Sequence, residues 1–380
     1  MSMQTAAAGG SPSTGAWQET FTITKTTSPA SPAHIAEVFA NPGFARFHTD
    51  HMALINWSPA NGWHDSRVVP YGPFSLDPAT SALHYGQEIF EGMKAYKHTD
   101  GSIVCFRPEQ NAARFARSAA RMTMPQLPAE LFIGAIEALL SLDAHWVPDG
   151  PDASLYLRPF MFATDPFLGV RPSDTYQFCL FAAPAGDYYA NGFKPVTVWI
   201  CDDYVRAAPG GTGEVKCAGN YAASLIAQAQ AAEHGCDQVV WLDAIERKYI
   251  EEVGAMNLGF VLGFGEDITI VTPKLTGTLL PGITRKSLLD VAVDLGYKVE
   301  ERQFSVDEWR QGSASGLVSE AFGCGTAAVI TSVGTVKSST GSWTMGDGSI
   351  GPVTKRLRSA LLSVQNGVAE DAHHWLRKMA

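Results

Sequence analysis

A single lysine set among glycines is the first feature of the chain that could do chemistry. Residues 206–221 read Arg-Ala-Ala-Pro-Gly-Gly-Thr-Gly-Glu-Val-Lys-Cys-Ala-Gly-Asn-Tyr, with three glycines just before Lys216 and a helix-like run of small residues after it. Glycine permits backbone conformations that side chains forbid, and it lets a ligand approach the main chain closely. Lys216 is therefore either a charge that contacts a phosphate or an amine nucleophile, whose pKa would be lowered by poorly hydrated surroundings.

The spacing argues against a phosphate loop at this position. That motif needs a lysine directly after glycine and a hydroxyl residue next, whereas Val215 and Cys217 flank Lys216. A second glycine motif, Gly-x-Gly-x-x-Ala at residues 323–328, would favour nicotinamide binding if it opened a helix, but residues 329–333 predict a strand. The nucleophile is the favoured interpretation, weighed against the solvated surface charge that most lysines are.

A pair of carboxylates, Glu251 and Glu252, gains meaning only beside the lysine, because alone it would be read as an exposed acidic turn. A pyridoxal 5'-phosphate (PLP) site needs a lysine, a group at the pyridine nitrogen, an anion cradle and usually a hydroxyl near O3'. Residues 281–285, which lead into a predicted helix, and residues 323–326 are two candidates for the cradle. The alternative for each is an ordinary helix cap or strand turn.

Metal and hydrolase chemistry have little support. His48 and His51 lie three residues apart with Asp50 between them, but no third ligand has an obvious spacing. The sequence has no Gly-x-Ser-x-Gly nucleophile motif. Its six cysteines are scattered without a Cys-x-x-Cys pair, which argues against a zinc ribbon or a disulfide framework and fits a reducing cytoplasm. We therefore expect no metal site and a cytoplasmic protein.

Composition narrows the expected partners. The chain has 380 residues, 46% of them hydrophobic, and a formal net charge of −10. A nucleic-acid-binding protein normally carries a basic cluster, which this sequence lacks. No apolar run reaches the ~18 residues that indicate a membrane helix. Small molecules, and neither nucleic acid nor membrane, are the expected partners.

The elements that must position these residues mix strands and helices in both halves, which predicts an α/β (mixed α+β) fold with the site in a cleft between two domains. The predicted division is a flexible tail at 1–15, a small domain at 16–184, a linker at 185–194 and a large domain at 195–380. Helices are expected at 83–90, 108–122, 129–146, 221–234, 285–295 and 354–364. Strands are expected at 154–162, 176–182, 196–201, 238–242, 268–272 and 327–333.

Many separate stretches, in order and over roughly residues 44–333, together resemble the branched-chain amino acid aminotransferases, which are class IV aminotransferases of PLP fold type IV. The stretches that carry the resemblance are Thr-Asp-His-Met at 49–52, Leu-His-Tyr-Gly-Gln-Glu-Ile-Phe-Glu-Gly-Met-Lys-Ala-Tyr at 83–96, Asn-Ala-Ala-Arg at 111–114, Leu-Tyr-Leu-Arg-Pro at 155–159, Gly-Gly-Thr-Gly-Glu-Val-Lys at 210–216, Glu-Val-Gly-Ala-Met-Asn at 252–257, Leu-Pro-Gly-Ile-Thr-Arg at 280–285 and Phe-Gly-Cys-Gly-Thr-Ala at 322–327.

The resemblance implies a role for each matching residue. Lys216 is similar to the lysine that carries PLP covalently and shuttles the proton, and Tyr221 to the tyrosine that hydrogen-bonds O3'. Glu252, rather than Glu251, matches the carboxylate at the pyridine nitrogen. The residues that match the rest of the cofactor site are Arg114, Arg206, Ile283, Thr284 and Thr326. The residues that match the substrate pocket are Tyr85, Phe90, Tyr156, Arg158 and Tyr188, with the Thr326–Ala327 backbone for the substrate carboxylate.

The implied reaction is transfer of an amino group from L-leucine, L-isoleucine or L-valine to 2-oxoglutarate, in a homodimer with active sites near the interface. One pocket must then take an apolar side chain and also the γ-carboxylate of glutamate, which would need a partner such as Arg158. The alternatives are two other enzymes of the same fold type, a D-amino acid aminotransferase and an aminodeoxychorismate lyase, or a non-catalytic PLP carrier.

The chain departs from the family pattern in three regions. Ala328 and Thr331 stand where some members have a Cys-x-x-Cys, so no thiol–disulfide switch is expected there. Cys324 stands where related chains often have serine or another small residue. Phe167 is bulky for the loop at 165–169, which in this family reaches toward the partner subunit's active site, so the resemblance implies an effect of Phe167 on substrate preference.

Overall fold

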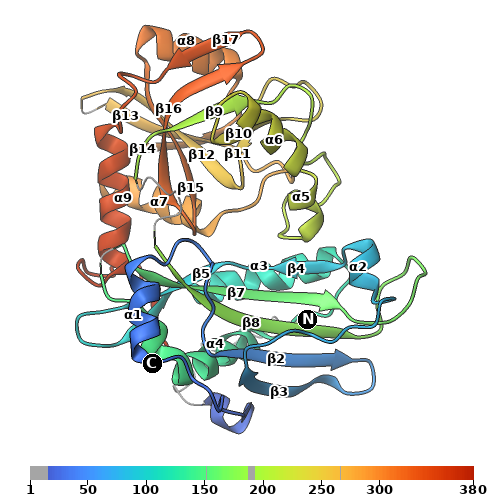
Figure 1. Cartoon of the computed structure of the whole chain (residues 1–380). Helices are drawn as coiled ribbons and strands as arrows, with labels where there is room; N and C mark the ends of the chain where they lie inside the picture. Colours follow the sequence, from blue (N-terminus) through green and yellow to red (C-terminus); the bar gives the residue numbers. More distant parts are fainter. Residues whose placement is uncertain (1–15, 151, 187–192, 266) are drawn as a thin grey trace, which may run out of the picture.

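The computed structural model describes residues 16–380 apart from 151, 187–192 and 266, and in this part of the chain the strands form two nine-stranded sheets. Figure 1 shows one sheet in each half of the molecule, with the first sheet below and the second above. Strands and helices are mixed in both halves, so the predicted α/β (mixed α+β) fold class is confirmed.

The first sheet has the strand order β1-β3-β2-β8-β7-β5-β6-β18, with β4 paired to β7. The bounds are β1 Thr22–Ile23, β2 His51–Ser58, β3 Gly62–Pro70, β4 Glu88–Phe90, β5 Met93–Lys97, β6 Ile103–Phe106, β7 Ser154–Ala163, β8 Tyr176–Ala185 and β18 Leu376–Lys378. The helices of this half are α1 Pro32–Ala40, α2 Ser81–Tyr85, α3 Pro108–Arg121 and α4 Ala129–Asp143. In the core that α3 and α4 share with the sheet, the Phe115 ring lies 5.5 Å from Phe132 and 5.7 Å from Phe178.

The second sheet has the order β11-β10-β9-β16-β15-β12-β13-β14, with β17 paired to β16. The bounds are β9 Val196–Ile200, β10 Gln238–Leu242, β11 Ile250–Val253, β12 Met256–Phe264, β13 Asp267–Pro273, β14 Lys298–Arg302, β15 Val318–Gly325, β16 Val329–Ser338 and β17 Gly341–Thr344. The helices are α5 Ala218–Ala222, α6 Leu225–Glu233, α7 Ile283–Asp294, α8 Val306–Ser315 and α9 Pro352–Gln365. A buried aromatic group anchors its core, because Phe260 stacks on Phe304 at 4.1 Å.

Two predicted helices differ from the observed elements. The helix expected at 83–90 ends at Tyr85, because Gly86 follows in a left-handed conformation (φ 61°), and residues 88–90 form β4 against β7. The helix expected at 221–234 is two helices, α5 and α6, separated at residues 223–224. The helices expected at 108–122, 285–295 and 354–364 are confirmed as α3, α7 and α9 with small shifts at their ends.

The domain limits stay predictions, because the tail at 1–15 and most of the linker at 185–194 lie outside the described residues. Strand β8 extends to Ala185, the residue at which the linker was expected to begin. The last strand of the predicted large domain lies in the first sheet. Leu376 of β18 pairs with Phe106 of β6, so residues 376–378 belong to that sheet. No helix in the described ranges is both long and apolar enough to cross a membrane.

Candidate active site

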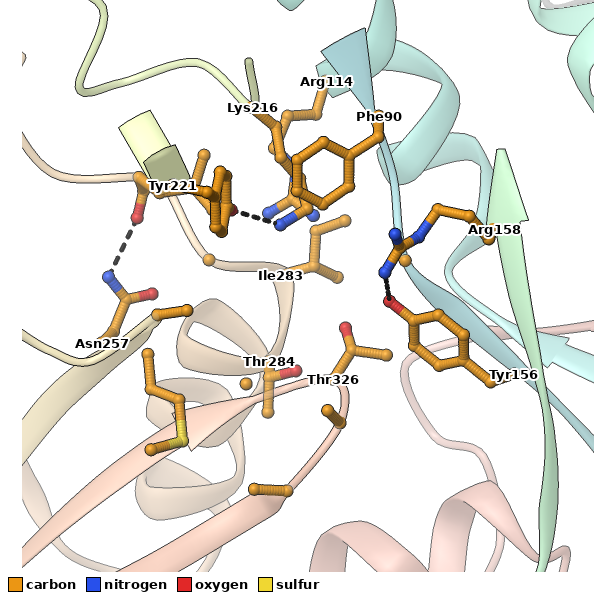
Figure 2. A pocket seen from close by; sticks show the side chains of 18 of the residues that line it. Phe90, Arg114, Tyr156, Arg158, Lys216, Tyr221, Asn257, Ile283, Thr284 and Thr326 are labelled. Atoms are coloured by element: carbon orange, nitrogen blue, oxygen red, sulfur yellow. Dashed lines mark hydrogen bonds between the residues drawn. The ribbon is translucent and has the colours of Figure 1, made fainter. Parts of the chain in front are cut away.

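A cavity of about 600 Å³ lies between the two halves and is lined by side chains from both. Its size is typical of a small-molecule site. Residues far apart in the sequence meet here, as Figure 2 shows for ten of them. The predicted site residues that line the cavity are Phe90, Arg114, Tyr156, Arg158, Lys216, Tyr221, Glu252, Ile283, Thr284, Thr326 and Ala327.

The main chain of Lys216 is held from two sides. Its N–H donates to the Ser118 hydroxyl at 3.0 Å, and its carbonyl accepts from the Phe90 N–H at 3.0 Å. Ser118 lies on α3 and Phe90 on β4, so two elements of the first half fix a residue of the loop that precedes α5. The main chain of Lys216 is therefore fixed at the point where its side chain extends into the cavity.

The Lys216 amine meets a hydroxyl and two rings. Its Nζ donates to the Tyr221 hydroxyl at 2.7 Å and lies 4.4 Å from the centre of the Phe90 ring (Figure 2). Burial, reinforced by the nearby positive charge of Arg114, lowers the pKa of Lys216 to about 8. An amine with this pKa is available as the neutral nucleophile close to neutral pH, in agreement with the nucleophile interpretation.

The glycines before the lysine allow close packing of the loop. Gly210 has a φ of 79°, and a Cβ on Gly213 would lie 2.2 Å from the Thr278 carbonyl oxygen. The Asn220 amide, in α5, donates to the carbonyls of Thr212 at 2.7 Å and Val215 at 2.8 Å. These bonds hold the loop against α5, while the close approach of Gly213 to Thr278 packs it on the segment that leads into α7.

Glu252 is buried on β11, and its carboxylate has three partners. It accepts from the Leu280 N–H at 2.6 Å, pairs with the Arg206 Nε at 2.9 Å and accepts from the Asn257 amide at 3.4 Å. Burial raises the pKa of Glu252, and the Arg206 guanidinium and the Leu280 N–H oppose that rise. The structure places Arg206 behind the cavity wall, because it does not line the cavity and also donates to the carbonyls of Gly213 and Thr278.

Arg114 depends on a residue that the sequence reasoning did not single out. Its guanidinium makes a bidentate pair with Glu91, with distances of 2.7 Å and 2.9 Å, and Asn111 donates to the same carboxylate at 2.8 Å. Burial alone would raise the pKa of Glu91, but Arg114 lowers it below its ordinary value. Both Glu91 and Asn111 lie within the stretches of the family resemblance, which was the available signal.

The two predicted cradle segments face the cavity. Helix α7 begins at Ile283 with Gly282 as its N-cap and no side-chain cap, so its first N–H groups have no internal partner. Thr326 and Ala327 form the turn between β15 and β16, and the Ala327 carbonyl accepts from the Lys94 ammonium at 3.0 Å. Lys94 lies on β5, so this bond links the first sheet to the turn.

The remaining wall is aromatic. The Arg158 guanidinium lies over the Phe90 ring at 4.8 Å and donates to the Tyr156 hydroxyl at 3.1 Å (Figure 2). A Cβ on Gly92 would come within 2.1 Å of that hydroxyl, so glycine is required where β4 leads into β5. This wall offers apolar ring surface together with one guanidinium.

The structure does not bring Tyr85 into the cavity wall, and it does not describe Tyr188. Tyr85 lies on α2, 43% exposed, and its hydroxyl donates to the Leu168 carbonyl. Tyr188 lies outside the described residues. Among the described residues, no group of three or more His, Cys, Asp or Glu side chains could hold a metal ion. His51 instead joins elements, with Nδ1 at 2.7 Å from Asp143 and Nε2 accepting from the Thr26 N–H.

A family model described as amino-transferase class IV matches residues 88–336, and the chain belongs to this family. That range includes the cavity residues named above, from Phe90 to Ala327. The class IV assignment agrees with the resemblance seen in the sequence.

Within the family, the chain is similar to branched-chain-amino-acid aminotransferases. It is 55% identical to the enzyme of Mycolicibacterium smegmatis, over 94% of this chain and 98% of that one. It is 56% identical to a probable branched-chain-amino-acid aminotransferase of Streptomyces coelicolor, over 93% of this chain and 96% of that one. The branched-chain amino acid aminotransferase structure of Escherichia coli has a TM-score of 0.70 and 29% identity, covering 86% of this chain and 100% of that chain.

The neighbouring structures include a complex that bears on the cofactor. A branched-chain amino acid aminotransferase from the organism abbreviated T.th. was solved with pyridoxamine 5'-phosphate, with a TM-score of 0.70 and 28% identity, over 86% of this chain and 99% of that chain. Its ligand is the pyridoxamine form of the cofactor that the sequence analysis expected here.

Proposed function

We propose that the chain is a PLP-dependent transaminase that transfers the amino group of L-leucine, L-isoleucine or L-valine to 2-oxoglutarate, giving branched-chain 2-oxo acids and L-glutamate. The observation that carries this proposal is the Lys216 amine, which has a pKa of about 8 and lies 2.7 Å from the Tyr221 hydroxyl in the cavity shared by both halves. The names of the relatives support the choice of substrates over the D-amino acid and aminodeoxychorismate alternatives.

The donor set of the cavity suits PLP. Lys216 would carry the cofactor covalently, and Glu252 would face its pyridine nitrogen as an acceptor kept in place by Arg206 and Leu280. The uncapped N–H groups at the start of α7, with the hydroxyls of Thr284 and Thr326, would hold the phosphate. Arg114 adds positive charge to this part of the cavity, while Arg206 acts through Glu252.

When bound, PLP supplies the electron sink that stabilises the negative charge left when the substrate Cα loses its proton. Once the substrate amine has taken its place on the cofactor, the free Lys216 Nζ would take that proton and hold it, because its lowered pKa matches a group that must gain and lose a proton near neutral pH. Tyr221 orients the amine through its hydroxyl. Phe90 and Leu280 line the cavity and help to exclude water from the amine.

Both substrates would use the aromatic wall. The rings of Phe90 and Tyr156 would contact the branched side chain of the amino acid donor. Arg158, held over Phe90 and bonded to Tyr156, would pair with the γ-carboxylate of glutamate or 2-oxoglutarate. The N–H groups of the Thr326–Ala327 turn would receive the α-carboxylate.

The proposal includes a homodimer with active sites near the interface. Its support is a set of partly exposed aromatic side chains on the first sheet: the Tyr71 ring lies 5.9 Å from Phe181, and Phe74 lies 6.2 Å from Phe160. Phe160 and Phe181 also line the cavity, so a second chain on this face would border the site. Tyr85, bonded to Leu168, and Phe167 would then contribute to the partner's site.

A cytoplasmic location is part of the same proposal. All six cysteines are buried with free thiols, which suits a reducing compartment.

The test is the visible absorption of the purified protein. A yellow protein that is bleached by L-leucine and restored by 2-oxoglutarate is the expected result. Turnover of D-alanine without turnover of L-leucine would overturn the substrate assignment, and a yellow protein that none of these substrates changes would indicate a PLP carrier. A colourless preparation that does not take up added PLP would overturn the cofactor assignment.

A further inference from the structure

Two neighbouring glutamates of β11 hold the same loop. Glu252 accepts from the Leu280 N–H at 2.6 Å, and Glu251 accepts from the Thr278 hydroxyl. Successive side chains of a strand point to opposite faces, so the two carboxylates approach the loop from different sides. The loop, residues 274–282, runs from β13 directly into α7.

The loop separates two cavities. Leu280 and Glu252 line the cavity of about 600 Å³, whereas Thr278 and Glu251 line a second cavity of about 160 Å³. Glu251 is only 5% exposed, and its Oε2 has no hydrogen-bond partner among the described residues. A buried carboxylate costs free energy unless it is bonded, so the bond to Thr278 is the contact that this side chain retains.

The loop depends on side chains because its residues form neither helix nor strand. Side chains from four other places in the sequence bind its main chain: Arg206 at the Thr278 carbonyl (2.8 Å), Asn257 at the Leu280 carbonyl (2.9 Å), Arg114 at the Pro281 carbonyl (3.2 Å) and Glu252 at the Leu280 N–H (2.6 Å). Glu251 adds a hydrogen bond from the Thr278 hydroxyl on the side of the second cavity. Thr278 is the first residue of the segment, 278–282, that these side chains bind.

We propose that Glu251 is a positioning residue for the cofactor phosphate: by holding Thr278 it fixes residues 278–282 and thereby the first N–H groups of α7. This inference rests on the proposed function. The main chain at Gly282 packs tightly against Asn257, because a Cβ on this glycine would lie only 2.0 Å from Asn257 Oδ1. The segment therefore has little room to move. A small displacement of this segment would therefore misplace the N–H groups that face the phosphate.

The experiment removes the same hydrogen bond from each end, with Glu251→Ala and Thr278→Val. PLP binding to the apoprotein is measured by quenching of tryptophan fluorescence, and deuterium exchange of residues 278–286 is measured without PLP. Each variant should weaken PLP binding about tenfold and speed exchange, in line with a hydrogen bond to a charged group. Thr278→Val also removes the contact of the Thr278 hydroxyl with the Thr276 hydroxyl at 2.8 Å, so the double variant should bind PLP no more weakly than Thr278→Val alone.

Glu246→Gln is the matched control, because Glu246 also lines the second cavity but is exposed and makes no bond to the loop. It should bind PLP as the unmodified protein does. Glu251→Gln keeps an acceptor oxygen for Thr278 and should restore binding to within about threefold. If Glu251→Ala does not fold, Thr278→Val decides the question, since valine has nearly the shape of threonine.

Unchanged PLP affinity, or weaker affinity without faster exchange, would overturn the positioning role of Glu251. Failure of the unmodified protein to bind PLP would instead overturn the proposed function. The exchange measurement still reports on the link between Glu251 and Thr278 in that case, so the two failures are distinguishable.

Discussion

The two walls of the cavity are built by different means. The wall made by β11, the loop before α7 and the buried pair of Glu91 with Arg114 consists of charges and amides with fixed partners. The other wall, made by Phe90, Tyr156 and Arg158, relies on ring surfaces and has one hydrogen bond among these side chains.

This difference matches the two ligands that we propose. A cofactor that stays bound benefits from donors held in place, because positioning is then provided before each reaction. A substrate pocket must accept both an apolar side chain and a carboxylate. It benefits from ring surfaces, because apolar contacts with a ring require no particular orientation of the ligand. Lys216 lies between the walls, touching Phe90 on one side and Tyr221 on the other.

The largest expected effect is at the residue that joins the walls. Lys216→Ala removes the amine nucleophile and proton carrier, so the rate of leucine transamination should fall about 10⁴-fold or more, and PLP should bind weakly and noncovalently. Absorbance and steady-state assays would measure both. Lys248→Ala, at an exposed lysine, is the control and should be fully active. Normal turnover of Lys216→Ala would refute the assignment of the site.

The next effect tests the rigidity of the cofactor wall. Glu91→Leu leaves Arg114 buried without its counter-charge, so the free energy of unfolding should drop by about 3–5 kcal/mol, as measured by urea denaturation. Glu109→Gln, which breaks an exposed pair with Arg377, should cost less than about 1 kcal/mol. Equal losses in the two variants would show that the buried pair has no special importance.

A smaller effect is expected on the aromatic wall. Arg158→Met keeps apolar contact with Phe90 but removes the guanidinium, so the KM for 2-oxoglutarate should rise about tenfold, equivalent to one lost charged hydrogen bond. The KM for L-leucine should change less than about threefold. A parallel rise in both values would mean that Arg158 shapes the pocket without selecting the carboxylate.

The smallest effect is expected outside both walls. Tyr85→Phe removes a hydroxyl that is already bonded to the Leu168 carbonyl but keeps the ring that we propose borders the partner's site, so kcat should be unchanged and KM should rise by no more than about threefold. Steady-state assays over a range of protein concentrations would reveal any dependence on a dimer. A tenfold change would place Tyr85 in a substrate pocket directly.

The sequence predicted the residues around Lys216 because they are close together in the sequence or belong to recognisable motifs. Lys216 and Tyr221 are five residues apart, and Ile283 and Thr284 follow Pro-Gly directly before the helix that was expected at 285–295. The fold class followed from the mixture of helical and strand patterns.

The supporting residues were missed because their contacts are distant in the sequence. Glu91 and Arg114 meet across a strand and a helix, and nothing in the local pattern around either predicts the pair. Arg206 was expected near the cofactor, yet it lies behind the cavity wall and pairs with Glu252, a distinction that depends on side-chain direction. The helix expected at 83–90 failed because pairing with β7 stabilises residues 88–90 as a strand.

The pairing of β18 with β6 has a consequence for how the protein is made. When the first half has left the ribosome, the strand that completes its sheet has not yet been synthesised, because Leu376, which pairs with Phe106, follows the whole second half in the sequence. Domains usually fold as they emerge, but this sheet gains its last edge only after the second half has been synthesised. The first sheet is therefore complete only in a chain that also contains the second half. A chain truncated before residue 376 would leave β6 as an unpaired edge strand.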